Sequence, residues 1–202
     1  MDHLYVKMEG QTPARIPSSD VFSVGRCVYL PRFDARASSA VPAGRGFGVQ
    51  VSQFSAGWGT SYLVAASFGE MLPHPDNHIS LDPARCDAWG IPILRIDCGH
   101  MAPDLERARA QRDALRELAE ALGVRFSQLS PIPAPPGASV HECGTARMGT
   151  DPSSSVLDPH NECWEAKGLY VTDAACFPSQ GCQNPTLTIM ALTARACGHA
   201  TR

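Results

Sequence analysis

Two short stretches near the end of the chain carry residues that could perform proton chemistry. The first is HECGTARMG, residues 141–149, which opens on His141, and the second is QNPTLTI, residues 183–189, which contains Asn184. Histidine is the side chain best suited to take a proton from a hydroxyl group near neutral pH. The asparagine amide both donates and accepts hydrogen bonds, so it could hold the same oxygen. These residue types predict a base and a hydrogen-bonding partner for an alcohol, provided that folding brings the two segments together.

The second stretch also carries a helix-start signal. Asn184 can cap free backbone N–H groups, and Pro185 fits the first helical position without losing a hydrogen bond. Apolar residues then recur at helical spacing at Leu187, Met190, Ala191 and Ala194, which predicts a helix of roughly three turns beginning at Asn184. A helix N-terminus carries free N–H groups and a partial positive charge. The predicted helix start is therefore a suitable site for an anion or for negative charge that develops on a bound cofactor.

A third stretch, GLYVTDAACFP at residues 168–178, precedes this helix. Its apolar run predicts a short buried strand from Leu169 to Thr172 that ends at Asp173. Open α/β sheets place their ligands at the carboxyl ends of such strands. The pattern therefore predicts that Asp173 and the backbone after it face a ligand.

These stretches together resemble a known family signature. The run H-x-x-G-T-x-R-M-G, followed by DP at 151, VLD at 156, LYVTDAACFP and NPTLT, resembles the C-terminal signature of the glucose-methanol-choline (GMC) family of FAD-dependent oxidoreductases, and the match covers residues 141–197. Upstream, FGEMLPHPDNHISLD (68–82) and DAWGIPILRID (87–97) look like the substrate-binding domain of that family. Nearly the whole chain is accounted for by this resemblance.

The resemblance implies a reaction and its residues. His141 would deprotonate or orient the alcohol, and Asn184 would be its partner. The implied reaction is oxidation of a CH–OH donor, an alcohol, sugar or polyol, with hydride passing to flavin N5, and the electron acceptor is left open. The positions that match FAD contacts are Asp173 and Ala174, beside the phosphates and ribityl chain, and Asn184, Pro185 and Thr186, beside the flavin ring.

One family feature is missing. Family members begin with a Rossmann-type βαβ unit that carries G-x-G-x-x-G, and this chain has no such motif. The glycines at 44, 46 and 48 lack the spacing and lead into the strand-like VQVSQF. Two interpretations follow. The chain is part of a flavoenzyme, either as a fragment or beside a separate N-terminal FAD-binding polypeptide, or it is a non-catalytic substrate-domain module. In both we expect that the chain alone does not bind FAD tightly.

The predicted fold class is mixed α+β and α/β: a GMC-type substrate-binding domain with an antiparallel sheet, and the C-terminal part of a Rossmann-like FAD-binding domain. Alternating residues predict strands in 21–30, 46–54 and 60–68. Residues 104–122 predict an amphipathic helix whose apolar face carries Leu105, Ala108, Leu115, Leu118 and Leu122. The proline-rich loop 131–138 separates a substrate-binding domain, 1–138, from a return segment of the FAD-binding domain, 139–202.

Composition narrows the class of protein. The chain is 44% hydrophobic with net charge −3, which is typical of a soluble globular protein. No clustered basic face supports nucleic-acid binding, and no apolar run of about eighteen residues supports a membrane span. The first residues lack the apolar core of a signal peptide, so we expect a cytoplasmic protein unless an export signal precedes them.

The eight cysteines form no C-x-x-C pair, so buried thiols and no metal site are expected. The alternative is a zinc site drawn from His141, Cys143, His160, Cys163, Cys176 and Cys182, whose spacing fits no standard finger or ribbon.

Overall fold

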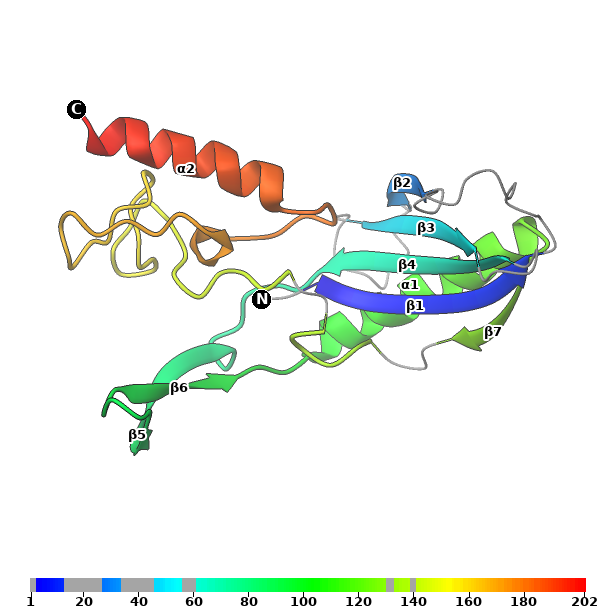
Figure 1. The fold of residues 1–202 in the computed structure, drawn as a ribbon, viewed down its shortest axis with the longest axis horizontal. Coiled ribbons are helices and arrows are strands. Elements are labelled where there is room, and N and C mark those ends of the chain that lie inside the picture. Colours follow the sequence, from blue (N-terminus) through cyan, green and yellow to red (C-terminus); the bar gives the residue numbers. More distant parts are fainter. Residues whose placement is uncertain (1–2, 13–26, 34–45, 56–60, 130–132, 139–140) are drawn as a thin grey trace.

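A five-stranded antiparallel sheet forms the main body of the protein (Figure 1). The fold comes from a computed structural model, which describes residues 3–12, 27–33, 46–55, 61–129, 133–138 and 141–202. The strands follow the order β2-β3-β4-β1-β7. Their bounds are β1 His3–Thr12, β2 Cys27–Phe33, β3 Phe47–Ser55, β4 Ser61–Glu70 and β7 Arg125–Leu129.

The strands predicted in 21–30, 46–54 and 60–68 are confirmed as β2, β3 and β4, while residues 21–26 lie outside the described part of the chain. β1 and β7 were not predicted. β1 interrupts its apolar residues with lysine, glutamate and glycine, and β7 has five residues only, so neither carries a clear alternating pattern. β1 becomes a strand because it pairs with the free edge of β4, and β7 because it pairs in turn with β1.

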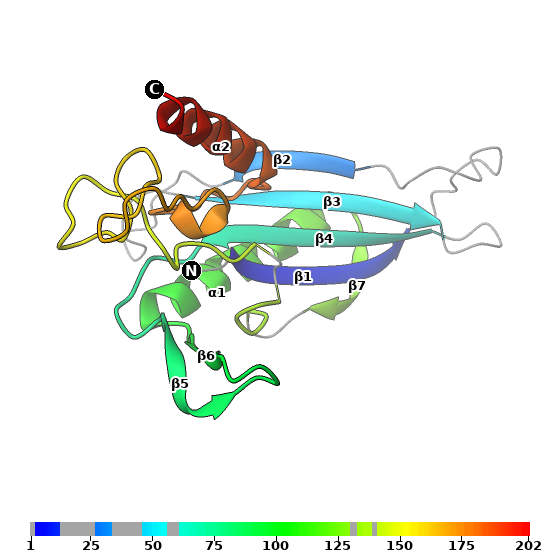
Figure 2. The same cartoon turned by 60° about the vertical axis from the view of Figure 1, so that its left-hand side comes forward.

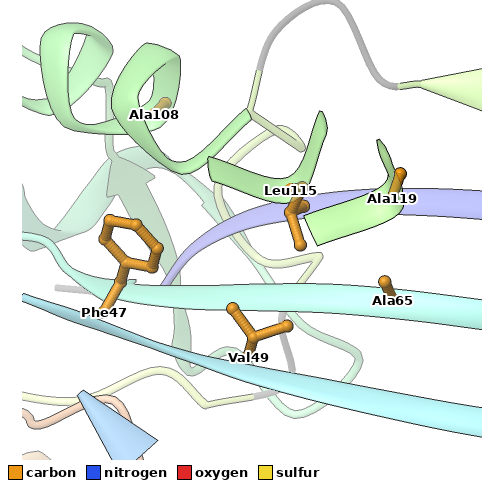
Figure 3. Packing of buried hydrophobic residues seen from close by; sticks show 6 residues of the cluster. All are labelled: Phe47, Val49, Ala65, Ala108, Leu115 and Ala119. Carbon is orange, nitrogen blue, oxygen red and sulfur yellow. The ribbon is translucent and has the colours of Figure 1, made fainter. Parts of the chain in front are cut away.

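Helix α1, Ala102–Ala121, covers one face of this sheet (Figure 3). The core between them consists of Phe47, Val49, Ala65, Ala108, Leu115 and Ala119. The predicted helix is confirmed, but it starts two residues before Asp104. The Asp104 carboxylate instead lies in the first turn, where it accepts a hydrogen bond of 2.8 Å from the Met101 backbone N–H.

The position predicted for Leu122 on the buried face is wrong, because its side chain is 56% exposed. The helix ends at Ala121, and Leu122 lies in the turn that leads to β7, beyond Ala119, the last buried residue of α1. Spacing alone cannot show where the sheet stops supporting the helix.

Strands β5, His78–Cys86, and β6, Pro92–Asp97, form a separate antiparallel hairpin that projects from the body (Figures 1 and 2). Sequence reasoning assigned this region to the substrate-binding domain without predicting its strands. Pro83 interrupts the first strand, and proline inside an apolar run argues against a strand. Pro83 is nevertheless tolerated, because β5 pairs with β6 only and is therefore an edge strand.

Residues 141–202 form mostly irregular loops, a 3-10 helix η1 at Ala174–Cys176, and helix α2 at Thr186–Ala200. Their own small core consists of Cys143, Leu157, Cys176 and Phe177. Within the described residues, no helix has both the length and the apolarity needed to cross a bilayer.

The strand predicted from Leu169 to Thr172 is wrong. Only Tyr170 makes an isolated bridge, to Glu162, and Leu169 is exposed. The backbone of this run pairs with a neighbouring loop instead, since Val171 N–H donates to the Asn161 carbonyl at 3.1 Å and the Leu169 carbonyl accepts from Cys163 N–H at 2.8 Å. An apolar run of four residues is too short to distinguish a strand from such a loop pair.

Candidate active site

The sheet face opposite α1 is contacted by the segment that follows η1, and Gly48 marks the point of contact. Phe47 and Val49 point into the core beneath α1, so residue 48 between them faces the other side. A Cβ atom at this position would lie 2.7 Å from the Tyr29 hydroxyl and 3.3 Å from Cys182 Sγ. Glycine therefore allows Tyr29 and Cys182 to approach the strand closely.

Tyr29 ties the loop that carries Asn184 to the edge strand β2. Its hydroxyl donates a hydrogen bond of 3.3 Å to the Cys182 backbone carbonyl, and it lies 3.9 Å from Cys182 Sγ. Burial, together with the hydrogen bond and charge interaction with Cys182, raises the pKa of Tyr29 to about 12. The hydroxyl is therefore neutral at physiological pH, and it holds the backbone two residues before Asn184.

His141 reaches the same end of the same sheet face. Its ring lies beside that of Phe68, with 6.0 Å between ring centroids and 43° between planes. Phe68 on β4 is directly paired with Gly48 on β3, where an added Cβ atom would lie 3.3 Å from Cys182 Sγ. Paired residues in an antiparallel sheet have Cα atoms roughly 5 Å apart. Folding thus brings the histidine segment and the asparagine segment to adjacent positions on one sheet face, although they are far apart in sequence.

Backbone hydrogen bonds hold the histidine segment along η1. Gly144, Ala146 and Met148 donate in turn to the carbonyls of residues 174, 175 and 176, at 3.1, 3.0 and 2.9 Å. Asp173 caps η1, because its carboxylate accepts from Ala175 N–H at 2.8 Å. Where these segments meet α2 there is a cavity of about 350 Å³, lined by Glu142, Cys143, Thr145, Asp173, Ala174, Ala175 and Ile189. Asp173 and Ala174, two of the predicted cofactor contacts, therefore line one cavity.

The sequence predicted that Asn184 caps α2, and this prediction is wrong. The first hydrogen bond of the helix runs from Ile189 N–H to the Pro185 carbonyl at 3.0 Å, which places Pro185 at the N-cap, and the helix begins at Thr186. The helix spans 15 residues, about four turns at 3.6 residues per turn, against roughly three predicted. The exposed Asn184 side chain is thereby free of a structural role in capping.

A second cavity, of about 270 Å³, lies at the N-terminus of α2. Asn184 and Pro185 line it, whereas Thr186, also a predicted flavin contact, is exposed and lines neither cavity. Sequence reasoning missed Gln180, which lines this cavity with 3% of its surface exposed. Neither atom of its side-chain amide has a hydrogen-bond partner within the described part of the chain. Such a buried, unsatisfied amide is costly unless a ligand or water completes it.

The expectation that the thiols are buried holds for part of the set only. Cys143, Cys176 and Cys182 are buried, whereas Cys27, Cys86, Cys98 and Cys197 are exposed. Burial raises the pKa of the Cys176 thiol, so it remains protonated and serves packing rather than nucleophilic chemistry. In the part of the chain that the structure describes, no three His, Cys, Asp or Glu side chains are grouped so that they could hold a metal ion.

A family model described as GMC oxidoreductase matches residues 73–193, which is more than half of the chain and includes both motif segments. The chain belongs to the GMC oxidoreductase family. The predicted resemblance is therefore confirmed, and so is the fold expected for the substrate-binding region of such an enzyme, antiparallel sheets with helices.

Relatives of this GMC chain are considerably longer. It is 32% identical over 183 residues to 2-methyl-1,2-propanediol dehydrogenase of Mycolicibacterium austroafricanum, which covers 78% of this chain and 33% of the dehydrogenase. It is 38% identical over 122 residues to C-glycoside 3-oxidase of Arthrobacter globiformis, covering 59% of this chain and 23% of the oxidase. The crystal structure of pyridoxine 4-oxidase from Mesorbium loti has the same fold, with a TM-score of 0.58 and 17% identity over 100% of this chain and 43% of its own. The GMC chain thus spans about a third or less of the curated relatives' length.

Proposed function

We propose that this chain supplies the substrate-binding and base-bearing part of an FAD-dependent oxidoreductase that oxidises a CH–OH donor. The observation that supports it is the convergence of His141 and the Asn184 loop on the paired residues Phe68 and Gly48. The similar dehydrogenase and oxidase are named for a diol and a glycoside, which favours an alcohol or sugar substrate here. The experiment that tests the proposal is the His141→Ala substitution argued in the Discussion.

The residues at the two cavities suit the flavin cofactor on which this family depends. The unpaired Gln180 amide, the exposed Asn184 amide and the N-terminus of α2 gather polar donors around the smaller cavity. We propose that Asn184, Pro185 and Thr186 lie beside the flavin ring, and that Asp173 and Ala174 lie along the ribityl and phosphate part. The partial positive charge of α2 would favour negative charge on a group held there. FAD, when bound, would supply the acceptor for the hydride of the substrate carbon.

The proton chemistry then falls to this chain's own side chains. His141 takes the hydroxyl proton of the substrate onto its imidazole, and the Asn184 amide donates a hydrogen bond to the same oxygen. The Tyr29 to Cys182 contact fixes the backbone before Asn184, which keeps the amide within a defined volume. We also propose that the chain divides near residue 138 into a substrate-binding part, 1–138, and a return segment of the FAD-binding part, 139–202.

A second candidate is a non-catalytic module that does not hold FAD by itself. The chain's short span relative to its relatives and its lack of the glycine motif favour this candidate for the isolated polypeptide. We therefore expect the 202-residue chain, purified after expression with excess riboflavin, to carry far less than one flavin per chain. Absorbance in the flavin bands relative to protein measures this ratio. A stoichiometric yellow preparation would contradict the prediction and exclude the module.

Replacing Asn184 with alanine should slow substrate-dependent flavin reduction about tenfold in the flavin-loaded enzyme, because a hydrogen bond worth about 1.4 kcal/mol is lost. Since Pro185 and not Asn184 is the N-cap of α2, the free energy of unfolding should change by no more than about 0.5 kcal/mol. Stopped-flow reduction and chemical denaturation measure the two quantities. A loss of about 1 kcal/mol in stability with an unchanged rate would restore the capping role and remove the catalytic one.

A further inference from the structure

The C-terminal part of α2 is fastened to a neighbouring loop by two side chains. Arg195 Nη2 donates a hydrogen bond to the Pro159 backbone carbonyl and another, of 3.1 Å, to Asn161 Oδ1. One helical turn later, the His199 ring stacks on the His160 ring, with 4.1 Å between ring centroids and 1° between planes. We call these two rings the histidine stack. Because residues i and i+4 lie on one helix face, both contacts hold the same side of α2.

The loop that carries His160 is held in place by contacts of its own. The Asp158 carboxylate accepts hydrogen bonds from the backbone N–H groups of His160, at 2.8 Å, and of Glu162, at 3.0 Å. The Asn161 side chain is fully buried and donates to the Val171 carbonyl at 3.0 Å. The backbone beneath the His160 ring is therefore fixed, so the two rings can separate only if the end of α2 moves.

On the helix side, the charged groups near the histidine stack are positive. Arg195 lies one turn before His199, and Arg202 follows it, with its backbone N–H donating to the His199 carbonyl at 3.2 Å. The C-terminus of a helix carries a partial negative charge, which favours a first proton on His199. A second proton, on His160, would place two like charges in rings only 4.1 Å apart. The stack therefore tolerates one proton and opposes the second.

On the loop side, two carboxylates lie near the stack, and both have other partners. The Asp158 carboxylate is bound by backbone N–H groups, and the Glu162 carboxylate accepts from Gly168 N–H at 2.9 Å and pairs with Lys167 Nζ at 3.4 Å. In the part of the chain that the structure describes, neither ring of the stack forms an ion pair with a carboxylate. The repulsion between two protonated rings is thus not cancelled by a dedicated counter-charge.

We propose that the histidine stack is a pH-sensitive latch, which holds the last turn of α2 on the loop while at most one ring is protonated and releases it when both are. Histidine side chains change charge between pH 5 and 8. With the turn released or unfolded the rings are apart and both bind protons, whereas the closed stack binds only one. The closed state is therefore favoured at neutral pH, and its stability falls as the pH falls below about 6.5.

The release is confined to the end of the helix. Nearer its start, Ile189 and Leu192 pack against the small core, and Thr193 Oγ1 donates to the Thr172 carbonyl at 2.8 Å. None of these contacts involves a group that titrates near neutral pH. The first turns of α2, and Asn184 before them, therefore stay in place when the latch opens.

Amide hydrogen exchange of the 202-residue chain at neutral pH and at about pH 5 tests the latch, after correction for the intrinsic exchange rate at each pH. The protection of amides 197–200 should fall about fivefold or more at the lower pH, relative to amides 189–193 of the same helix. His160→Phe and His199→Phe each keep a flat ring in the stack and remove one proton site. Each should abolish the pH effect, because a single protonated imidazole is attracted to the face of an aromatic ring.

His74→Phe is the matched control. His74 lies in the loop before β5, where its side chain is 42% exposed and its ring is 3.5 Å from the Asp76 carboxylate, away from α2. The same substitution there should keep the parental pH effect on amides 197–200.

Three results would overturn the latch. The first is equal protection of amides 197–200 at the two pH values. The second is a loss that extends equally over the whole of α2, since that would be unfolding of the helix or the chain. The third is a pH effect that survives both phenylalanine substitutions in the stack, or one that His74→Phe removes. These measurements need neither flavin nor substrate, so this inference and the proposed function can fail separately.

Discussion

Replacing His141 with alanine is expected to lower alcohol-dependent flavin reduction about a hundredfold or more, the usual contribution of a positioned general base. The prediction applies to the flavin-loaded enzyme that contains this chain. His141 lies beside Phe68 on the sheet face opposite α1, whereas the predicted cofactor contacts lie along η1 and at the start of α2. Flavin content should therefore remain close to the parental value while the rate falls. Anaerobic stopped-flow reduction at neutral pH, with flavin absorbance before mixing, measures both.

Two comparisons separate a base from a merely structural histidine. His160→Ala is the matched control, because His160 is exposed and stacks on His199 with 4.1 Å between ring centroids, away from Phe68. It should reduce the flavin at the parental rate. Added imidazole should restore part of the rate in His141→Ala and leave the control unchanged. If His141→Ala kept its flavin and the parental rate, the assignment of this residue as the base would be wrong.

Replacing Leu115 with alanine is expected to destabilise the chain by about 2 to 5 kcal/mol, the range for removing a buried leucine side chain. Leu115 is fully buried in the core that α1 makes with β3 and β4 (Figure 3). The surrounding side chains come from three elements, so the cavity can collapse only partly. The free energy of unfolding from a denaturant titration gives the effect directly. A loss below about 1 kcal/mol would mean that α1 does not pack on the sheet in this register.

Leu122→Ala is the matched control for that experiment, because the same substitution is made at the end of the same helix. The amphipathic pattern places Leu122 on the buried face, whereas the structure leaves it 56% exposed in the turn after α1. The structure predicts a loss within about 0.5 kcal/mol. If Leu115→Ala and Leu122→Ala lowered the free energy of unfolding equally, Leu122 would be buried as the apolar spacing predicts, and the observed packing would be wrong.

The sequence by itself determined the family and the long regular elements. HECGTARMG and NPTLT specify the GMC family because they combine particular residue types at fixed spacing. The helix at Ala102–Ala121 and the strands β2 to β4 follow from periodicity within single segments. In each case the decisive pattern lies within about twenty consecutive residues, because the spacing of apolar residues along one helix or strand determines which of its faces is apolar.

Only the tertiary structure decided how these segments meet. Tyr29 and Cys182 are 153 positions apart, and their close approach to β3 depends on Gly48, the second residue of that strand, where an added Cβ atom would meet both. The N-cap of α2 was decided in the same way: two neighbouring residues, Asn184 and Pro185, both carry start signals, and the observed backbone bonds choose between them. Four aliphatic side chains of β5 and β6 are 39% to 71% exposed, although aliphatic residues are usually buried: Ile79, Leu81, Leu94 and Ile96. Burial depends on which surfaces meet across the chain, and no local spacing encodes that.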